Sequence, residues 1–506
     1  MAQMSPVNTP VAPSTATAFQ AAIVAAGVAA VATLSATYLT GTTDTNYATL
    51  ELALAATPVG GTLNIYGTWT RTTPFVVNQA CTVRGGCGGS ITATTGHAVT
   101  VTANSVTLDG LTLIGTGAAT EGTARAVSAV GTVGTPVDRL TVRNCAITGW
   151  SEYGIYAEQV TNFIFDANLI STIAYAGIMV LSGIGGKITG NKVTTITQPT
   201  GLTDSYGIAM SRVSTTSLAV SPRSSDIECS GNTVSGNPLW EGIDTHGGQR
   251  LTITGNKVLG CYIGIALVPG NNTGGVASYA PLDIICSGNT INSQVSNGTY
   301  SNGIQISGAG VTAGSPVESA TGIITGNTII DHGLDSATPA SSDGGILAFF
   351  TAGVVLSNNR VVRGATCGIQ IYHTNAGLIV SGNTIEDAWS NLAAYTMDVR
   401  IRSTYNTPTL SGTSIIRGAK TATIVNAWGL WVDSSTNNTV IDGGGNGWAA
   451  AVAPINIPVG VFKSCVNDAV PVVKAVAITT PTSDTVGTKA AIDAIRVALT
   501  NYGITA

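Results

Sequence analysis

The densest group of side chains able to do chemistry lies in the segment WEGIDTHGGQR, residues 240 to 250. Asp244 and His246 are two residues apart, and side chains two apart on a β-strand project from the same face. Glu241 lies just before this strand. Glycoside cleavage needs two carboxyl groups roughly 5 to 9.5 Å apart, one donating a proton and the other acting as base or nucleophile. Glu241, Asp244 and His246 are therefore the candidate catalytic residues.

Nearby residues extend this candidate site. Trp240 precedes Glu241 and would stack on a sugar ring, and Asp343 would approach from the loop of a neighbouring coil. A polysaccharide lyase would use the site differently, because it needs a base together with a cation or an arginine beside the uronate. The plainer alternative is structural: Asp244 and His246 bond each other or a partner subunit.

The composition excludes several other functions. Only 9% of the residues are charged, the net charge is −5, and no run of basic residues could follow a phosphate backbone, so we expect no nucleic-acid partner. The eight cysteines are dispersed, with no CxxC pair and no Cys/His cluster, which argues against a zinc site. Phosphate-binding loops and the GxSxG and HExxH motifs are missing, and we expect no cofactor and no metal.

Membrane insertion and secretion are also not expected. The apolar stretch from residue 19 to residue 32 is about 14 residues long, which is shorter than the roughly 20 residues of a bilayer span. The first basic residue is Arg71, so the positively charged start of a secretory signal is lacking. We expect the apolar stretch to form a buried element at a subunit contact.

Two short motifs alternate along the chain and determine the fold. One is Gly-Ile-x-apolar, which begins at residues 154, 177, 207, 242, 264, 303, 345 and 368. The other is apolar-x-Gly-Asn-x-apolar, with looser copies, and its asparagines are Asn168, Asn191, Asn232, Asn256, Asn289, Asn327, Asn359 and Asn383. The shortest spacings between these asparagines, 23 and 24 residues, fit one coil of a parallel β-helix, and longer spacings are coils with insertions. Asparagine tolerates left-handed turn geometry, and its amide would bond the equivalent asparagine one coil on.

The repeat predicts an all-β fold, a single-stranded parallel β-helix (solenoid) over residues 46 to 448, with roughly 13 to 16 coils. A helix over residues 47 to 56 would cap the open end of the stack, where apolar core and unpaired strand edges would otherwise be exposed. Residues 1 to 45 form an N-terminal arm. Residues 449 to 506 form a C-terminal segment that ends in a short amphipathic helix over residues 485 to 501.

The Gly-Ile-x-apolar motif also predicts which side chains point outward, because Ile points inward and residue x outward. Two exposed rows along one face follow. The first row is Tyr156, Met179, Ala209, Asp244, Ala266, Gln305, Leu347 and Gln370. The second row is Glu158, Leu181, Ser211, His246, Val268, Ser307, Phe349 and Tyr372. An exposed face this apolar indicates a subunit seam or a carbohydrate-binding groove, and the plainer alternative is a set of scattered surface hydrophobes. Tyr156, Trp240, Phe349 and Tyr372 are therefore candidate glycan or interface residues.

Two further expectations come from the coil register. Cys229 and Cys286 occupy the same inward position with Ile253 between them, so they lie two coils apart, roughly 10 Å, which is beyond the reach of a disulfide. Both should be free thiols. Asp331, His332 and Asp335 lie in an insertion that we expect to be a solvated loop.

The capping helix followed by Gly60-Gly61 and a strand, together with the repeated xGNxI coils, resembles the right-handed parallel β-helix proteins of the pectin-lyase-like superfamily. The resemblance covers about residues 46 to 448 and implies the right-handed form of the solenoid. Polygalacturonase-like members carry NTD, DD, GHG and RIK motifs. None of these occurs in this sequence, although Arg400-Ile401-Arg402 is faintly similar to the last one, and pectate-lyase signatures are missing as well. The superfamily therefore implies a fold and does not imply catalysis.

The low charge, the abundance of Thr, Ala and Gly and the closing segment TVGTKAAIDAIRVALTNYGI are similar to virion proteins of tailed bacteriophages, particularly minor tail and tail-spike proteins. That resemblance implies a homotrimer in the tail or tail tip of a virion, exposed to the extracellular medium. Its partners would be other tail proteins, contacted through the arm at residues 1 to 45, and a host cell-surface glycan. The implied function is a structural tail protein that presents a host-binding β-helix, and the alternative is a polysaccharide depolymerase, a hydrolase or lyase, on the same scaffold.

Overall fold

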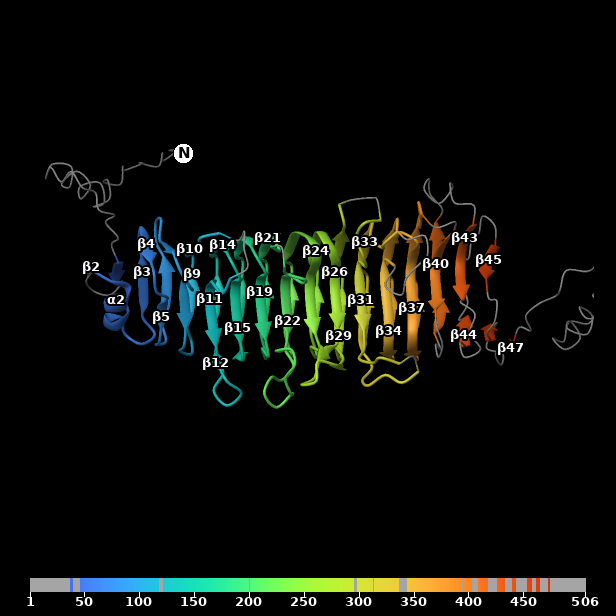
Figure 1. Cartoon of the computed structure of the whole chain (residues 1–506), viewed down its shortest axis with the longest axis horizontal. Helices are drawn as coiled ribbons and strands as arrows, with labels where there is room; N and C mark the ends of the chain where they lie inside the picture. The colour runs from blue at the N-terminus through green and yellow to red at the C-terminus, as the bar shows by residue number, and fades with distance from the viewer. Residues whose placement is uncertain are drawn as a thin grey trace, which may run out of the picture.

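The computed structural model is a long rod in which the chain winds through successive coils from its N-terminal to its C-terminal part (Figure 1). It describes residues 37–39, 46–117, 122–199, 201–294, 298–312, 314–335, 344–392, 395–402, 408–416, 426–432, 439–442, 453–456, 461–464 and 472–473, and every structural statement below concerns these residues. They confirm the predicted all-β parallel β-helix.

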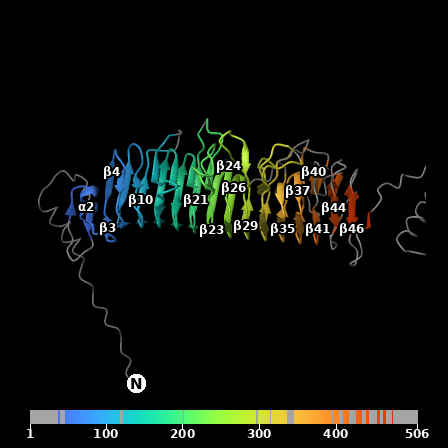
Figure 2. The same ribbon diagram turned by 90° about the horizontal axis from the view of Figure 1, so that it is seen from below.

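The first of the three faces of the rod is part of an 18-stranded sheet, whose strands follow one another along the rod in Figure 2. All of its strands except β1 (Thr37–Leu39), β2 (Asn46–Tyr47) and β47 (Val472–Val473) stack in parallel, giving fifteen coils, within the predicted range. The stacked strands are β3 (Thr62–Ile65), β6 (Thr82–Gly85), β9 (Thr107–Asp109), β13 (Thr141–Arg143), β17 (Ile164–Asp166), β20 (Lys187–Thr189), β23 (Glu228–Ser230), β25 (Thr252–Thr254), β29 (Ile284–Ser287), β32 (Gly322–Thr325), β35 (Val355–Ser357), β38 (Ile379–Ser381), β41 (Thr409–Ser411), β44 (Thr439–Asp442) and β46 (Val461–Ser464).

The other two faces form one 25-stranded sheet, because β24 (Thr233–His246) and β26 (Lys257–Val268) run without a break from one face to the other. The second face also contains β4 (Thr68–Arg71), β7 (Ser90–Ala93), β10 (Thr112–Ile114), β14 (Ala146–Trp150), β18 (Leu169–Ile173), β21 (Lys192–Ile196), β30 (Thr290–Asn292), β33 (Thr328–Ile330), β36 (Arg360–Val362), β39 (Thr384–Glu386) and β42 (Ser414–Ile416). The third face, which we call the Gly-Ile face, contains β5 (Phe75–Val77), β8 (Val99–Val101), β11 (Arg125–Val130), β15 (Tyr153–Glu158), β19 (Ala176–Leu181), β22 (Tyr206–Ser211), β31 (Ile304–Ser307), β34 (Ile346–Ala352), β37 (Cys367–Ala376), β40 (Tyr395–Arg402), β43 (Asn426–Val432) and β45 (Ala453–Asn456).

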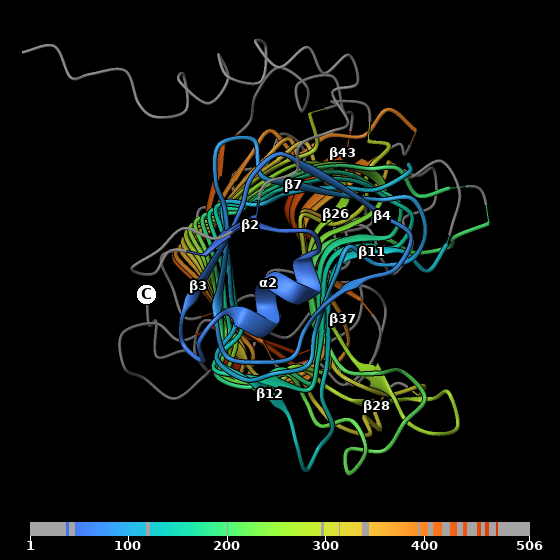
Figure 3. The same ribbon diagram turned by 90° about the vertical axis from the view of Figure 1, so that its left-hand side faces the viewer.

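Helix α2 (Leu50–Ala56) lies across the N-terminal end of the coil, as predicted (Figure 3). It begins three residues later than the sequence suggested, because Thr49 is the N-cap and its hydroxyl accepts the main-chain N–H of Leu52. Leu50, Ala53 and Leu54 are buried and cover the apolar end of the first coil.

The register predicted from the Gly-Ile motif is confirmed. Its isoleucines form one inward column of paired, fully buried side chains, consisting of Ile155, Ile178, Ile208, Ile243, Ile265, Ile304, Ile346 and Ile369. Cys229 and Cys286 both pair with Ile253 and are free and buried, as expected. Burial raises the pKa of each of these two thiols to about 12.

The asparagine positions form a buried ladder along the corner between the first two faces. Asn232 shows the pattern: its amide nitrogen donates to the carbonyl of Ile188 at 2.8 Å and to Oδ1 of Asn256 at 3.0 Å. Its own Oδ1 accepts the main-chain N–H of Asn191 at 2.9 Å. The predicted contact between equivalent asparagines is therefore confirmed.

The other reason given for these asparagines is wrong. The left-handed residue of the turn is the one that precedes each asparagine, such as Gly231 with φ 63° or Ala167 with φ 53°, and the ladder asparagines have negative φ. Glycine is the usual residue for that conformation, and asparagine is required one position later for its hydrogen bonds.

The prediction that the first outward row is exposed is also wrong. Tyr156 and Met179 are only 7% and 5% exposed, and Ala209, Ala266 and Gln370 are fully buried within the single chain. The reason is that outward side chains and loops of neighbouring coils pack on one another. Phe349 and Tyr372 of the second row are half-buried, with ring centroids 6.3 Å apart.

Asp331, His332 and Asp335 are buried, which corrects the expectation that they lie in a solvated loop. Asp331 accepts two hydrogen bonds from Arg363, both 2.7 Å long, and Asp335 accepts from the Ser390 hydroxyl at 2.6 Å. His332 is 1% exposed, and burial lowers its pKa to about 4. These residues have structural roles inside the coil stack.

Several predictions lie outside the described residues. They concern Asp343, the helix over residues 485 to 501, and most of the arm at residues 1 to 45. Of that arm, β1 pairs antiparallel with β3. Within the described part of the chain, no helix has the length and hydrophobicity needed to cross a lipid bilayer.

Replacing a ladder asparagine should destabilise the rod. Asn232→Ala would leave the buried main-chain groups of Ile188 and Asn191 without their partners. We expect the free energy of unfolding to fall by about 2 to 4 kcal/mol, as measured by urea denaturation followed by circular dichroism. The control is Asn104→Ala, because Asn104 is exposed and accepts a single hydrogen bond, from the Asp138 main chain. A similar loss in both variants would contradict the assigned role of the ladder.

Candidate functional site

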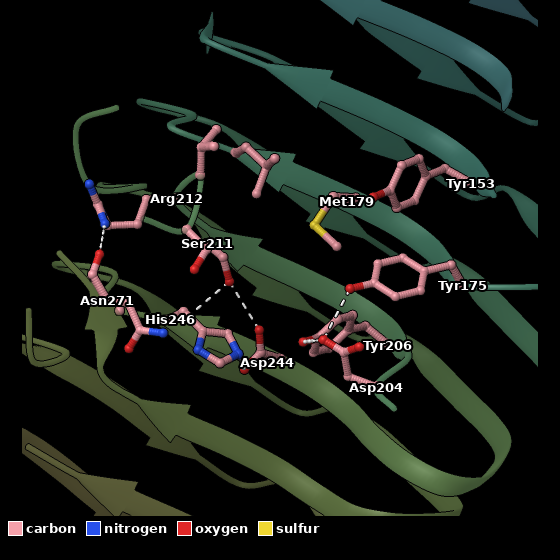
Figure 4. A pocket seen from close by; sticks show the side chains of 14 residues that line it. Tyr153, Tyr175, Met179, Asp204, Tyr206, Ser211, Arg212, Asp244, His246 and Asn271 are labelled. Atoms are coloured by element: carbon pink, nitrogen blue, oxygen red, sulfur yellow. Dashed lines mark hydrogen bonds and ion pairs between the residues drawn. The ribbon is translucent and has the colours of Figure 1, made fainter. Parts of the chain in front are cut away.

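The candidate site is a pocket of about 310 Å³ on the Gly-Ile face, over strands β15, β19, β22 and β24 (Figure 4). Three tyrosines line one part of it, and Ser211, Asp244 and His246 line another. The complete set of lining residues is Tyr153, Tyr175, Met179, Leu181, Asp204, Tyr206, Ser211, Arg212, Val213, Ser214, Asp244, His246, Gly270 and Asn271.

Strand β24 brings two of the predicted residues here by bending from the second face into the Gly-Ile face. Its register with β26 shifts between Asn237 and Glu241. The buried amide of Asn237 holds this bend by donating to the carbonyls of Glu241 at 2.8 Å and Ser205 at 3.1 Å. Glu241 therefore lies within the strand, not before it as the sequence suggested, and pairs with Tyr206 of β22.

Asp244 is fully buried at the pocket, and its two carboxylate oxygens have different surroundings. Oδ2 accepts the Ser211 hydroxyl at 3.0 Å, and Oδ1 faces Nε2 of His246 at 3.5 Å. The Ser211 hydroxyl oxygen also accepts the main-chain N–H of His246 at 2.9 Å. One serine thus positions both residues, and the side chains of Asp244 and His246 lie side by side without a hydrogen bond between them.

Glu241 lies close to Asp244 but does not line the pocket, and its exposure is 4%. Burial raises the pKa of Glu241 well above its usual value, and the charge of Asp244 raises it further. Burial also raises the pKa of Asp244, an effect opposed by the attraction of His246 and the hydrogen bond from Ser211. The two carboxyl groups consequently hold a proton more readily than two isolated carboxylates would.

Asp204 and the tyrosines form the aromatic part of the pocket. The Asp204 carboxylate accepts the hydroxyls of Tyr175 at 3.1 Å and Tyr206 at 3.0 Å. Tyr175 contacts Tyr153 and Tyr206 edge to face, with ring centroids 5.5 and 5.6 Å apart. The pocket therefore offers apolar ring surface beside fixed carboxylate oxygens.

Two arginines hold the loops that form the pocket wall. The Arg212 guanidinium donates to the carbonyls of Thr216 and Asn271, each at 2.6 Å. Arg223 donates to the carbonyl of Gly247 at 2.9 Å and forms an ion pair with Glu318 at 2.6 Å. These contacts connect the loops after β22, β24, β26 and β31, in agreement with the projections beside the Gly-Ile face in Figure 3. The wall is a cross-linked unit rather than a set of separate loops.

The other candidate glycan or interface residues do not line this pocket. Trp240 stacks on Tyr262 of β26, with centroids 6.5 Å apart and an interplanar angle of 11°. Tyr156 is buried under the Arg125 guanidinium, which lies 3.7 Å from the ring centroid. Phe349 and Tyr372 belong to a separate aromatic cluster on β34 and β37.

Sequence reasoning missed the tyrosines and Asp204. Strict alternation from the inward isoleucine would place Tyr206, two residues earlier, inward as well. The intervening glycine breaks the alternation, because a Cβ on Gly207 would lie 2.2 Å from Cγ1 of Val234 and 2.4 Å from the carbonyl oxygen of Gly242. A signal was present, since tyrosine precedes Gly-Ile at both 153 and 206. For Asp204, which lies in an insertion, the sequence holds no comparable signal.

One group of residues near the pocket has the donor set of a metal site. Single donor atoms of Glu241, Asp244 and His246 lie within 4.8 Å of one another. The expectation of no metal rested on the lack of a Cys/His cluster, which does not address a site built from two carboxylates and one imidazole.

Comparisons with known proteins agree with the fold. Residues 123–280 match a family model described as a right-handed β-helix region, and a search of curated proteins finds no match. Similar solved structures include the Dettilon tailspike protein, at 15% identity and a TM-score of 0.44 over 63% of this chain and 60% of that one. A GH87 α-1,3-glucanase from Streptomyces thermodiastaticus strain HF3-3 has 16% identity and a TM-score of 0.39, over 78% of this chain and 64% of that one. The periplasmic alginate epimerase AlgG has 11% identity and a TM-score of 0.47, over 70% of this chain and 85% of that one.

The family match supports the right-handed form of the parallel β-helix. The chain spans less than two thirds of the length of the tailspike and glucanase chains, at 60% and 64%.

The raised pKa of Glu241 predicts a pH-dependent stability. Its protonated form contributes stability that is complete below the usual carboxyl pKa and is lost as the pH rises through the folded-state value. In buffer with EDTA, from about pH 5 to about pH 9, the melting temperature of the wild type should fall more steeply than that of Glu241→Gln, because the variant lacks this buried titrating carboxyl group. Glu228→Gln, at a half-buried position of β23, should leave the fall in place. Parallel profiles of the wild type and Glu241→Gln would contradict the buried, proton-holding pair.

Proposed function

We propose that this chain is a tail-associated β-helix protein of a tailed bacteriophage, whose pocket on the Gly-Ile face binds a cell-surface glycan. The observation that carries the proposal is the pocket itself, in which aromatic rings and carboxylate oxygens are held together on a cross-linked wall. The phage setting rests on the sequence resemblance, namely the low charge and the abundance of Thr, Ala and Gly.

A sugar fits this chemistry because it has both apolar C–H surfaces and hydroxyl donors. Tyr175, Tyr153 and Tyr206 offer ring surface for the former, and Asp204 and Asp244 offer acceptors for the latter. The scaffold supplies rigidity, since the lining residues come from strands of adjacent coils in fixed register. A preorganised pocket of this kind loses little conformational entropy on binding.

The charge of the pocket favours a neutral or amine-bearing sugar over a uronate. Asp204 and Asp244 line it, while Arg212, the lining arginine, directs its guanidinium to the Thr216 and Asn271 carbonyls of the wall. A ligand carboxylate beside two acidic side chains would be repelled, whereas hydroxyl or ammonium donors would be attracted.

The alternative function is glycan cleavage on the same scaffold. It is favoured by one observation: Glu241 and Asp244 are adjacent carboxyl groups with raised pKa values, the condition of a general acid at neutral pH. Binding is preferred because Glu241 does not line the pocket, so only one member of the pair would reach a sugar.

Removing part of the aromatic surface should weaken glycan binding. We expect Tyr175→Ala to weaken binding to envelope polysaccharide at least tenfold by biolayer interferometry, because Tyr175 supplies ring surface and an ordered hydroxyl to the pocket. Tyr300→Ala is the matched control, since Tyr300 is a partly buried tyrosine away from the pocket. Unchanged binding by Tyr175→Ala would argue against this pocket. New reducing ends that disappear with Asp244→Asn would favour the depolymerase.

The proposed assembly is a homotrimer, and mass photometry should give three times the mass of the chain. If the cluster with Phe349 and Tyr372 forms the seam, Phe349→Asp should shift the protein to monomers while its β-sheet circular dichroism is retained, because a carboxylate would be buried without a partner. Val130→Asp, at an exposed position of β11 on the same face, should remain trimeric. A monomeric wild-type protein would reject the assembly without affecting the glycan test.

A further inference from the structure

Two carboxyl groups and an imidazole converge beside the pocket with atoms that have no hydrogen-bond partner. Glu241 Oε2, Asp244 Oδ1 and His246 Nε2 are all buried and unpartnered, and Glu241 and Asp244 are themselves 4% and 0% exposed. Buried polar atoms are nearly always satisfied, and the Glu241 and Asp244 carboxyl groups lie within hydrogen-bonding reach of each other, so the three atoms indicate a missing positive charge between them, either a shared proton or a metal ion.

The orientation of His246 identifies which atom faces that partner. Its Nδ1 lies 3.4 Å from the carbonyl oxygen of Pro269, and a carbonyl accepts hydrogen bonds, so Nδ1 carries the proton. In the neutral ring Nε2 then presents a lone pair toward Oδ1 of Asp244 at 3.5 Å. Two acceptors face each other at this separation, and a cation between them would turn repulsion into attraction.

Few of the described positively charged side chains lie near the two carboxyl groups to balance their charge. Among the described residues, no lysine or arginine forms an ion pair with Glu241 or Asp244, and Arg212 directs its guanidinium to main-chain carbonyls of the wall. A proton shared by the carboxyl groups, with a protonated His246, would satisfy the same atoms. The competing occupants are therefore protons and a metal ion.

We propose that Glu241, Asp244 and His246 bind a divalent transition-metal ion, with Zn²⁺ as the reference ion, at the side of the pocket. One imidazole nitrogen with two carboxylates is a donor set that zinc accepts, whereas Ca²⁺ takes six to eight oxygen ligands. Ligand atoms about 2.0 to 2.1 Å from a tetrahedral zinc lie about 3.4 Å apart, close to the 3.5 Å between Nε2 and Oδ1. The position left open would face the pocket, which Asp244 and His246 line.

Surrounding residues hold the three ligands in place. Ser211 donates to Oδ2 of Asp244, which leaves Oδ1 for the ion, and Pro269 fixes the ring of His246 through Nδ1. Asn237 holds the main chain of Glu241. Such outer contacts orient metal ligands and select the histidine tautomer. The proposed metal site shares Asp244 with the proposed glycan pocket but does not depend on glycan binding, because the three ligands and their supports are present whether or not a glycan binds.

The test measures zinc on the full-length protein. After treatment with EDTA, loading with Zn²⁺ and dialysis, inductively coupled plasma mass spectrometry should find one zinc per chain. Anomalous diffraction at the zinc edge should place it within bonding distance of Glu241, Asp244 and His246. Glu241→Gln, Asp244→Asn and His246→Gln should each weaken zinc binding at least tenfold by isothermal titration calorimetry.

Two controls separate this site from other binding. Cys87→Ser removes an exposed thiol, and Glu228→Gln removes a half-buried carboxylate on another face of the rod, and both should retain the zinc. Thermal denaturation identifies variants that fail to fold. Where a variant does not fold, the position of the anomalous zinc peak in the wild-type protein tests the site instead. Zinc that is lost with Cys87→Ser, a substoichiometric zinc content in the wild type, or an anomalous peak elsewhere would overturn the proposal. Glycan binding measured in EDTA tests the proposed function separately.

Discussion

The whole rod depends on one coil meeting the next in a fixed register, and the buried asparagine ladder is where side chains enforce that register. Backbone hydrogen bonds between parallel strands would tolerate a shift along the strand direction. A ladder asparagine would not, because its amide donates to a carbonyl of the preceding coil while its oxygen accepts from the chain there. A slip would leave several buried polar groups without partners, at a cost of about 1 to 3 kcal/mol each. The ladder therefore keeps the register of neighbouring coils the same at this corner, even where the coils differ in length elsewhere.

The candidate site follows from that invariance. Since inward isoleucines and ladder asparagines are fixed, the outward residues of adjacent coils are brought side by side, and Tyr206 comes to pair with Glu241 and Ala209 with Asp244. Insertions are accommodated in loops before and after the strands of the Gly-Ile face, and Arg212 and Arg223 bind the loops that follow these strands to one another. A regular scaffold thus carries an irregular wall, and the pocket lies where the two meet. The bend of β24, held by Asn237, adds the buried carboxyl pair at this junction.

The sequence was sufficient to predict the parts of the molecule that repeat. The spacing of the asparagines and the Gly-Ile motif predicted the parallel coil, its inward isoleucine column and the separation of Cys229 from Cys286. Each of these features repeats once per coil, so it can be found from the sequence period. The side-by-side placement of Asp244 and His246 could also be predicted, because it follows from the two-residue period of a β-strand. The predictions that were wrong depended on packing between distant segments: the burial of Tyr156, of Met179 and of His332 was not predicted. Alternation also failed locally at Gly207, where close approach of Val234 overrides the two-residue period and turns Tyr206 outward.

Helix α2 has a consequence for how such a rod is made. It seals the first coil by burying Leu50, Ala53 and Leu54, and it lies at the end of the β-helix that leaves the ribosome first. Each coil contacts mainly its neighbours, so a nascent chain can begin from a closed end and add one coil at a time, each new strand docking on the last exposed edge. Only one growing edge is open at any moment, and it moves along with synthesis. The seal at the start thereby gives folding a direction and confines the aggregation-prone edge to a single, short-lived site.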